Sequence, residues 1–211
     1  MEQSYFIPFS AYAEDNFVER RSKFTGRLRH VETPEEATAK IKEMRDTYWD
    51  ATHHCYAYIL REGNLMRYSD DGEPQGTAGM PILDVLRHEH LVDVCCVVTR
   101  YFGGILLGTG GLVRAYTNGA KIAVAASGVS EMSMFSVLLI ACPYNLLGVV
   151  QQVLPAHGCM VDETDYGADV TLTVSQPAGN LEALNAALAE ATAGQVYAEE
   201  MEQKFMGRRV K

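Results

Sequence analysis

The sequence predicts an α+β protein of two domains. Strand-like and helix-like apolar spacings alternate along the chain, and its last part follows the order strand, helix, strand, strand, helix, strand. The charge distribution also changes, because 14 of the 18 Lys and Arg residues precede residue 130 and the other four lie near the end. The turn-like stretch Ser127-Gly128-Val129-Ser130 lies at this change. We therefore expect one domain at 1–130 and another at 135–211.

The composition is that of a globular protein. Of the 211 residues, 47% are hydrophobic and 21% are charged, which suffices for a core in each domain. No apolar run reaches the roughly 18–20 residues of a membrane span, and Met1–Ser10 lacks the pattern of a secretory signal. The five cysteines form an odd set, which fits a reducing compartment. We expect a cytoplasmic protein with no membrane partner.

Apolar spacing and turn residues predict the elements of the first domain. Thr33-Pro34-Glu35-Glu36 is a helix start with a capping box and a proline at the first helical position. The expected elements are a long strand at 16–31, a helix from Pro34 to near Trp49, strands at 54–60 and 65–69, a loop at 70–79, a short helix from Pro81, a central strand at 92–101, a loop at 103–110 and a buried helix at 112–126.

The second domain has a simpler pattern. Leu147, Val150 and Leu154 share one face of an expected helix, and Leu181, Leu184 and Leu188 share one face of another. The expected strands are 135–142, 159–166, 169–174 and 195–205, and the expected helices are 144–157 and 181–193. The order βαββαβ is that of a ferredoxin-like domain. This fold hosts many functions and identifies none.

A glycine-rich segment, Arg100–Arg114, joins a buried strand to the start of a helix. Five glycines let backbone amides converge on an anion, and the helix dipole adds partial positive charge. Candidate ligand-binding residues for a phosphate or a partner are Arg100, Gly103, Gly104, Gly108, Thr109, Gly110, Gly111 and Arg114. The segment lacks the signatures of a nucleotide P-loop and of a dinucleotide-binding turn. The alternative is a tight turn packed against the sheet.

An acidic segment, Ser69–Pro81, also leads from a strand into a helix. Its three carboxylates, Asp70, Asp71 and Glu73, are the kind of ligand that Mg²⁺ or Ca²⁺ takes, although the spacing is not that of an EF-hand. The alternative, which we prefer, is a turn with acidic side chains facing solvent. Gly76 and Thr77 complete the candidate ligand-binding set. Both segments are expected at one edge of the domain, around one cleft.

Basic residues recur at every second position of the first expected strand. Arg21, Lys23, Arg27 and Arg29 fall on one face, about 6–7 Å apart, which resembles the spacing of successive phosphates. These residues are candidates for nucleic-acid binding; the alternative is a charged edge that resists aggregation. The net charge of −9 argues against strong general DNA binding, which requires many cations to neutralise phosphates. Any nucleic-acid contact is expected to be local.

No catalytic constellation is recognisable. His53-His54-Cys55 invites a zinc assignment, but neighbours on a strand point to opposite faces and no second ligand pair follows at zinc spacing. No Gly-x-Ser-x-Gly motif indicates a hydrolase nucleophile. We therefore expect no catalytic residue, no metal and no cofactor, and we leave open whether the protein is an enzyme.

Four segments make the sequence resemble a known family. Arg21–Phe24, His53–Cys55, Ser69–Pro81 and Val97–Tyr116 closely resemble the YigZ/IMPACT family, and the resemblance to its bacterial two-domain members spans the chain. It implies a first domain similar to the second domain of ribosomal protein S5 and a ferredoxin-like second domain similar to modules of elongation factor G. It also implies a link to translation, since eukaryotic relatives resemble regulators that act through a protein partner during amino-acid starvation.

Two functions from different classes follow. The first is a translation-associated regulatory or binding protein that contacts RNA, the ribosome or a translation-factor partner through the glycine-rich loops and the basic strand. The second is an enzyme that acts on a small phosphorylated or acidic ligand, with a metal held by the acidic segment opposite the amides of Gly108–Gly111. An affinity for RNA or ribosomes that falls steeply with salt favours the first function. Thermal stabilisation of the protein by a metal and a small ligand favours the second.

Overall fold

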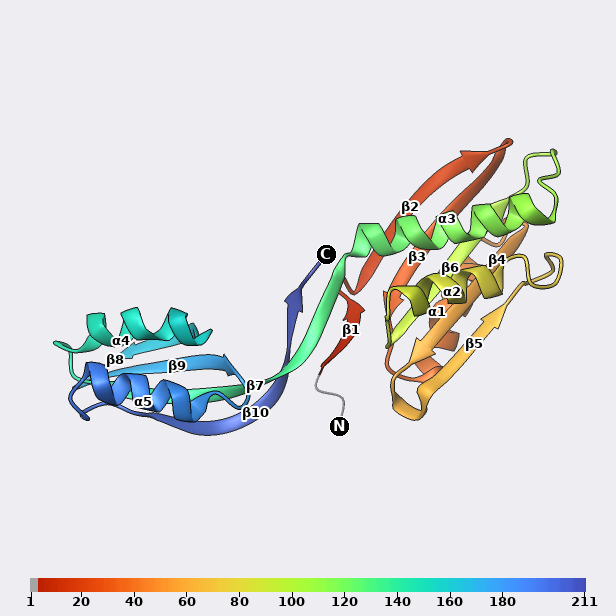
Figure 1. The fold of residues 1–211 in the computed structure, drawn as a ribbon. Helices are drawn as coiled ribbons and strands as arrows, with labels where there is room; N and C mark the ends of the chain where they lie inside the picture. Colours follow the sequence, from red (N-terminus) through yellow and green to blue (C-terminus); the bar gives the residue numbers. More distant parts are fainter. Residues whose placement is uncertain (1–3) are drawn as a thin grey trace. The chain divides into compact units, whose positions relative to one another are not determined.

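A computed structural model describes residues 4–211. It divides into two compact units, one formed by Tyr5–Glu131 with Arg208–Lys211, the other by Met132–Gly207 with Ser4 (Figure 1). Both units combine helices with a β-sheet, so the predicted α+β class is confirmed. Among residues 4–211, no helix has the length and apolar content needed to span a membrane.

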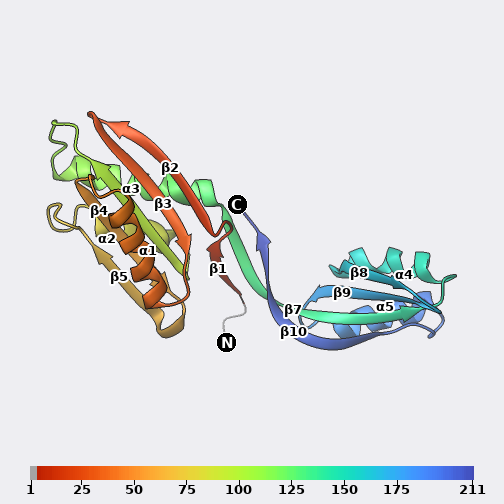
Figure 2. The ribbon, with the colours of Figure 1, turned by 180° about the vertical axis from the view of Figure 1, so that it is seen from behind.

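The first unit is a sheet with helices on both faces. Its strands are β2 (Tyr12–Glu19), β3 (Ser22–His30), β6 (Val94–Tyr101), β4 (His53–Leu60) and β5 (Leu65–Ser69), in this spatial order and antiparallel. Helices α2 (Gly79–His88) and α3 (Thr109–Ser127) lie on one face, in front in Figure 1. Helix α1 (Pro34–Thr47) lies on the other face, in front in Figure 2. Short strand β1 (Ser4–Pro8) and the turn η1 (Glu62–Asn64) complete the elements up to α3.

Strand β6 is buried on both faces, as its continuous apolar run predicts. Cys96 and Val98 pack in the core beneath α2 and α3, whereas Cys95 and Val97 pack in the core beneath α1. Side chains alternate across a strand, so a strand covered on both faces needs apolar residues at every position. The position of β6 in the middle of the sheet follows directly from this pattern.

The prediction of one long strand at 16–31 is wrong. The chain forms a hairpin, β2 and β3, which turns at Arg20 and Arg21 with φ values of 45° and 66°. Two successive positive φ angles are typical of the tightest hairpin turns, which normally use Asn or Gly. Because arginines occupy both positions, the usual sequence signal for a turn is missing. Stacking of Phe17 on Phe24, with ring centroids 5.2 Å apart, holds the hairpin together next to the turn.

The predicted boundaries of α1 and α3 differ from those of the structure by up to three residues. Thr33 caps α1, since its hydroxyl oxygen accepts a hydrogen bond from the Glu36 amide at 3.2 Å, and α1 ends at Thr47, two residues before Trp49. Helix α3 begins at Thr109, three residues earlier than predicted. Gly110 and Gly111 therefore belong to its first turn and not to the preceding loop.

The second unit confirms the predicted βαββαβ order. Strand β7 (Val129–Cys142) is followed by α4 (Leu147–Val153) with the turn η2 (Leu154–His157), then β8 (Met160–Tyr166), β9 (Val170–Pro177), α5 (Leu181–Ala191) and β10 (Ala198–Arg209). In the sheet, β9 lies between β7 and β8 and is antiparallel to both, and β1 and β10 also pair with β7. Both helices pack on one face of this sheet, over a core that contains Leu138, Ile140 and Leu172.

Strand β7 begins earlier than the strand predicted at 135–142. Gly128, with φ of 72°, ends α3, and β7 begins immediately at Val129, six residues before the predicted Phe135. Glycine reaches this left-handed conformation without a steric penalty, which lets a helix stop within one residue.

Candidate functional site at the loop end of the first unit

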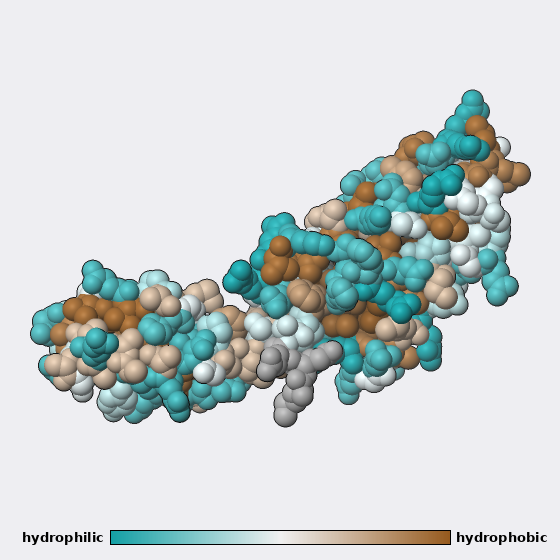
Figure 3. All heavy atoms as spheres, viewed as in Figure 1, coloured by the Kyte–Doolittle hydropathy of each residue, from teal (hydrophilic) through white to brown (hydrophobic). Residues whose placement is uncertain are grey.

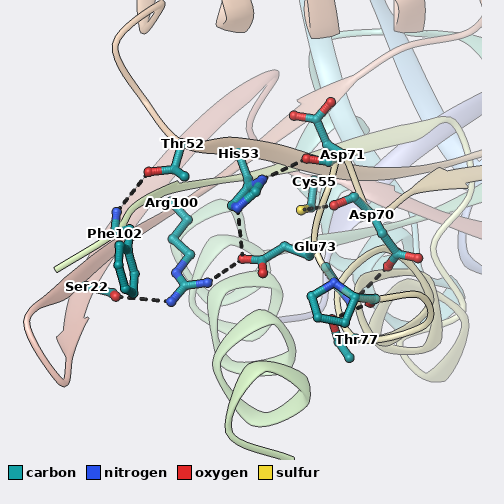
Figure 4. Close-up of polar contacts among 12 residues, drawn as sticks. Ser22, Thr52, His53, Cys55, Asp70, Asp71, Glu73, Thr77, Arg100 and Phe102 are labelled. Atoms are coloured by element: carbon teal, nitrogen blue, oxygen red, sulfur yellow. Dashed lines mark hydrogen bonds and ion pairs between the residues drawn. The ribbon is translucent and has the colours of Figure 1, made fainter. Parts of the chain in front are cut away.

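Three connections meet at one end of the first sheet, which we call the loop end. They are the β2–β3 turn at Arg20 and Arg21, the acidic loop at 70–78 and the glycine loop at 102–108. The strand register explains the meeting, because Lys23 pairs with Tyr101 and His53 pairs with Arg100. The predicted proximity of the two loops is therefore present in the structure, where Arg100, two residues before the glycine loop, bonds to Glu73 of the acidic loop (Figure 4).

A buried carboxylate, Glu73, is the centre of these contacts. Its Oε1 accepts hydrogen bonds from Arg100 Nη1 at 2.6 Å and from the Tyr116 hydroxyl at 2.7 Å, and His53 Nε2 lies 3.8 Å away. The side chains of Glu73 and Arg100 are only 4% and 5% exposed. Figure 4 shows the Glu73 carboxylate facing His53 and Arg100. A buried charge needs such a partner, because desolvation without one is costly.

Arg100 links the acidic loop to the start of the glycine loop. Its Nη2 donates to Ser22 Oγ at 3.3 Å, and the same oxygen accepts from the Gly103 amide at 3.2 Å. Its guanidinium lies near the rings of Phe24 and Phe102, at 5.4 and 5.3 Å from their centroids. The charge of Arg100 is therefore paired inside the fold and does not face the first turn of α3.

Asp70 and Asp71 also bond within the chain. The Asp70 carboxylate accepts hydrogen bonds from the amides of Gly76, Ala78 and Gly79 at 2.8, 3.0 and 2.8 Å, so it caps the start of α2. Asp71 pairs with Arg45 at 2.6 Å and accepts from the His54 amide at 2.7 Å; its carboxylate points away from Glu73 (Figure 4). The Thr77 hydroxyl donates to the Pro74 carbonyl at 2.6 Å.

This bonding conflicts with the expectation of acidic side chains that face solvent, since Glu73 is buried. Each of the three carboxylates also bonds to different partners, so they do not converge on one point. Within residues 4–211, no group of three or more His, Cys, Asp or Glu side chains is placed to hold a metal ion.

The motif His53-His54-Cys55 alternates across β4, as predicted. The Cys55 thiol donates to the Asp70 carbonyl at 2.9 Å, and burial raises the pKa of Cys55 well above its usual value. Burial likewise raises the pKa of Tyr116, next to Glu73 and Cys55. The thiol and the phenol are therefore protonated at neutral pH, and neither is an activated nucleophile.

The glycine loop has an open side next to α3. Gly104 and Gly108 have φ values of 80° and 73°, and the space next to both is empty. Gly103 differs, because a Cβ there would lie 2.1 Å from the backbone of Arg21. The loop exposes three large apolar side chains, Phe102 at 45%, Ile105 at 40% and Leu106 at 79%. Figure 3 shows hydrophobic residues at this end of the unit.

A pocket of about 270 Å³ lies beside the first turn of α3. Its lining residues are Phe17, Glu19, Arg20, Leu107, Gly111, Arg114, Ala115 and Asn118. The first helical backbone bond runs from the Leu112 amide to the Gly108 carbonyl, and no side chain caps the helix, so the amides of Thr109, Gly110 and Gly111 precede the bonded ladder. Arg20, which the sequence interpretation missed, joins Arg114 here because the β2–β3 turn brings it to α3.

The four basic candidates of the first strand do not form one exposed row. Arg21 lies in the turn, and Arg27 is 5% exposed, paired with Glu14 at 2.9 Å and lying 3.9 Å from the Tyr48 ring centroid. Arg29 pairs with Glu43 at 2.9 Å and lies over the Tyr12 ring at 4.0 Å. Lys23 is exposed. Strand β2 and helix α1 supply the partners that the sequence pattern did not show.

Two family models match the chain. The model described as Impact N-terminal domain matches residues 20–124, and the domain of unknown function DUF1949 matches residues 140–195. The IMPACT family member YvyE of Bacillus subtilis is 39% identical over 171 residues, which cover 81% of this chain and 78% of that protein. The IMPACT family member YigZ of Escherichia coli is 34% identical over 195 residues, 91% of this chain and 95% of that protein.

A eukaryotic relative matches about half of this chain over about a third of its own length. Protein IMPACT-B of Xenopus tropicalis is 35% identical over 108 residues, 48% of this chain and 33% of that protein. A solved structure, titled as the crystal structure of a hypothetical protein, is 33% identical, with a TM-score of 0.60 over 96% of this chain and 99% of that one. Because matches above 30% identity extend over most of the sequence, the chain belongs to the IMPACT family.

Proposed function

We propose that this chain is a translation-associated binding protein and that the loop end of its first unit contacts RNA, the ribosome or a translation-factor partner. Membership of the IMPACT family supports the link to translation that the sequence resemblance implies. The observation that carries the binding site is the pocket beside α3, which Arg20, Arg114 and Gly111 of the first helical turn line together.

The chemistry of this pocket favours a phosphate-bearing partner. The guanidinium groups of Arg20 and Arg114 supply donors and positive charge to a space of about 270 Å³, which Gly111 and the carboxylate-bearing Glu19 also line. The neighbouring apolar side chains of Phe102 and Leu106 are exposed and offer surfaces on which a base can stack or an apolar side chain can pack. Among the three proposed partners, RNA of the translation machinery combines these features.

The bonding at Glu73 supports binding rather than catalysis. Glu73 is already bonded to Arg100 and Tyr116, and the Cys55 thiol is held protonated by burial. The alternative, an enzyme for a small phosphorylated or acidic ligand, requires a metal at the acidic loop. It has less support, because Asp70 and Asp71 already bond to backbone amides and to Arg45.

Cosedimentation of the purified chain with ribosomes at increasing salt concentration tests the proposal. We expect the affinity to fall with salt, and we expect the double variant Arg20→Ala/Arg114→Ala to reduce the slope of log affinity against log salt by about one for each phosphate that the variant no longer neutralises. The control is Lys42→Ala/Arg87→Ala, which removes the same charge from exposed positions on α1 and α2. Equal effects of the two double variants, or no ribosome binding at low salt, would disprove the proposed site.

A further inference from the structure

The sheet of the second unit has a second face that its helices leave uncovered. Leu138 and Ile140 of β7 point into the core beneath α4 and α5, so their neighbours Leu139 and Ala141 point to the opposite face. Ala141 is exposed and Leu139 is half-buried, although both are apolar. An apolar strip on an open sheet face is typical of a surface that another molecule covers.

A groove of about 350 Å³ lies over the end of β7 on this face. Its lining residues are Leu139, Ala141, Cys142, Pro143, Asp169, Gln195, Tyr197 and Glu199. Asp169 lies in the turn between β8 and β9. Tyr197 directly precedes β10, and Glu199 lies at the start of β10. The groove thus combines apolar residues of β7 with a carboxylate from each neighbouring segment.

Charge complementarity identifies the occupant. Residues 132–207 contain nine Asp and Glu against a single Lys, a formal charge of −8 out of −9 for the whole chain. Asp169 and Glu199 are exposed, and within residues 4–211 neither forms an ion pair. This surface repels phosphates and attracts cations.

We propose that the groove binds a basic segment of a partner protein. The aliphatic stem of an Arg or Lys side chain packs on Leu139 and Ala141, and its charged head lies between the carboxylates of Asp169 and Glu199. Tyr197, 60% exposed, offers the face of its ring to the same cation. The groove is larger than one side chain, which suits two adjacent residues of an extended segment.

This site is independent of the proposed function. It lies in the second unit and has the opposite charge. Its proposed partner is a cationic protein segment, whereas the proposed partner of the loop end bears phosphate. Failure of either proposal leaves the other intact.

Fluorescence anisotropy with the full chain and a labelled oligoarginine peptide tests the inference. We expect the double variant Asp169→Asn/Glu199→Gln to weaken binding by about five- to thirtyfold, as for the loss of two partly exposed ion pairs. The control, Glu182→Gln/Glu190→Gln, removes the same charge from exposed positions of α5, and we expect a change of less than about twofold because α5 packs on the face of the sheet opposite the groove. Tyr197→Ala tests the ring separately and is expected to weaken binding as well.

Three outcomes would overturn the inference. Equal losses in the two double variants would show that net charge alone attracts the peptide. Undiminished affinity in Asp169→Asn/Glu199→Gln, with unchanged thermal unfolding, would place the peptide elsewhere. Binding of a single-stranded RNA that depends on the same residues would assign the groove to a different class of partner.

Discussion

At the scale of single residues, Glu73 and Arg100 define the loop end. The sequence suggested Arg100 as a charge partner for a bound anion, whereas the structure pairs it with Glu73 at 2.6 Å in a buried position. Removing one partner of a buried pair leaves the other charge desolvated, which costs more than the pair itself contributes. The two residues are therefore expected to govern the stability of the loop end.

We predict that Arg100→Ala lowers the free energy of unfolding by about 3–5 kcal/mol, because it leaves the Glu73 carboxylate buried without its cation. Urea denaturation measures this change. The double variant Arg100→Met/Glu73→Gln is expected to be more stable than Arg100→Ala, since neither charge remains. The exposed variant Arg87→Ala serves as the control, with a change within about 0.5 kcal/mol. A stable Arg100→Ala protein that has lost phosphate binding would restore the anion-binding role.

His54 makes stability depend on pH. Burial lowers the pKa of His54 below its ordinary value of 6.5, and its ring nitrogens lie 3.1 Å from the Tyr48 carbonyl and 3.2 Å from Thr99 Oγ1. The unfolded chain then binds a proton at a higher pH than the folded chain. The contribution of neutral His54 to the stability of the fold is complete above about pH 6.5. It is lost as the pH falls from there towards the lower pKa of His54 in the folded state.

We therefore predict that the free energy of unfolding of the wild type decreases from pH 7.5 to pH 5.5, and that His54→Gln flattens this part of the profile. Urea denaturation at a series of pH values measures both. His88→Gln, at a side chain that is 88% exposed, is the control and should keep the wild-type slope. A His54→Gln profile with an unreduced slope would contradict the assignment.

At the scale of elements, close packing of α3 on the sheet positions its first turn. A Cβ at Gly26 of β3 would lie 1.9 Å from the Gly119 carbonyl oxygen of α3, so helix and strand approach backbone to backbone. The candidate glycines do not all have the positive φ that the sequence interpretation expected: Gly110 lies in the helix and has no positive φ, whereas Gly108 has φ of 73°. Glycine is required where packing or φ demands it, and not throughout the loop.

We predict that Gly26→Ala destabilises the protein by about 1–3 kcal/mol or more, because the added methyl group overlaps a backbone atom that cannot move alone. Gly148→Ala in α4 is the matched control, with no atom within 4 Å, and is expected to leave stability unchanged or to raise it by up to about 1 kcal/mol. Thermal and urea unfolding compare the two. Similar destabilisation in both variants would refute the close approach of α3 to β3.

At the scale of the whole molecule, the two units differ in charge as well as in fold. Residues 132–207 carry a formal charge of −8, so the remaining residues nearly balance at −1. Each unit has its own core, formed around β6 in the first and around Leu138 and Leu172 in the second. Distinct cores and different net charges suit two separate binding functions.

We predict that a fragment of residues 132–207 folds on its own, because its four strands and two helices share one core. Circular dichroism during urea denaturation should show a single cooperative transition. The fragment 135–211, which corresponds to the predicted domain, is the comparison, and it is expected to be less stable because it lacks the first residues of β7 in this unit. A gradual, non-cooperative transition of the 132–207 fragment would contradict its independence.

Sequence periodicity by itself determined the α+β class, the βαββαβ order and the central place of β6, because apolar spacing directly reflects which faces are buried. The alternation of His53–Cys55 across a strand was also predictable. The likenesses of the first domain to ribosomal protein S5 and of the second to modules of elongation factor G stay predictions. Only the tertiary structure decided the roles of the charged residues. Arg20 reached α3 through a turn without Gly or Asn, and Arg27, Arg29 and Arg100 found partners on β2, α1 and the acidic loop. Ion pairs between residues distant in the chain leave no periodic signal, so a basic pattern alone cannot separate an exposed binding surface from a neutralised interior.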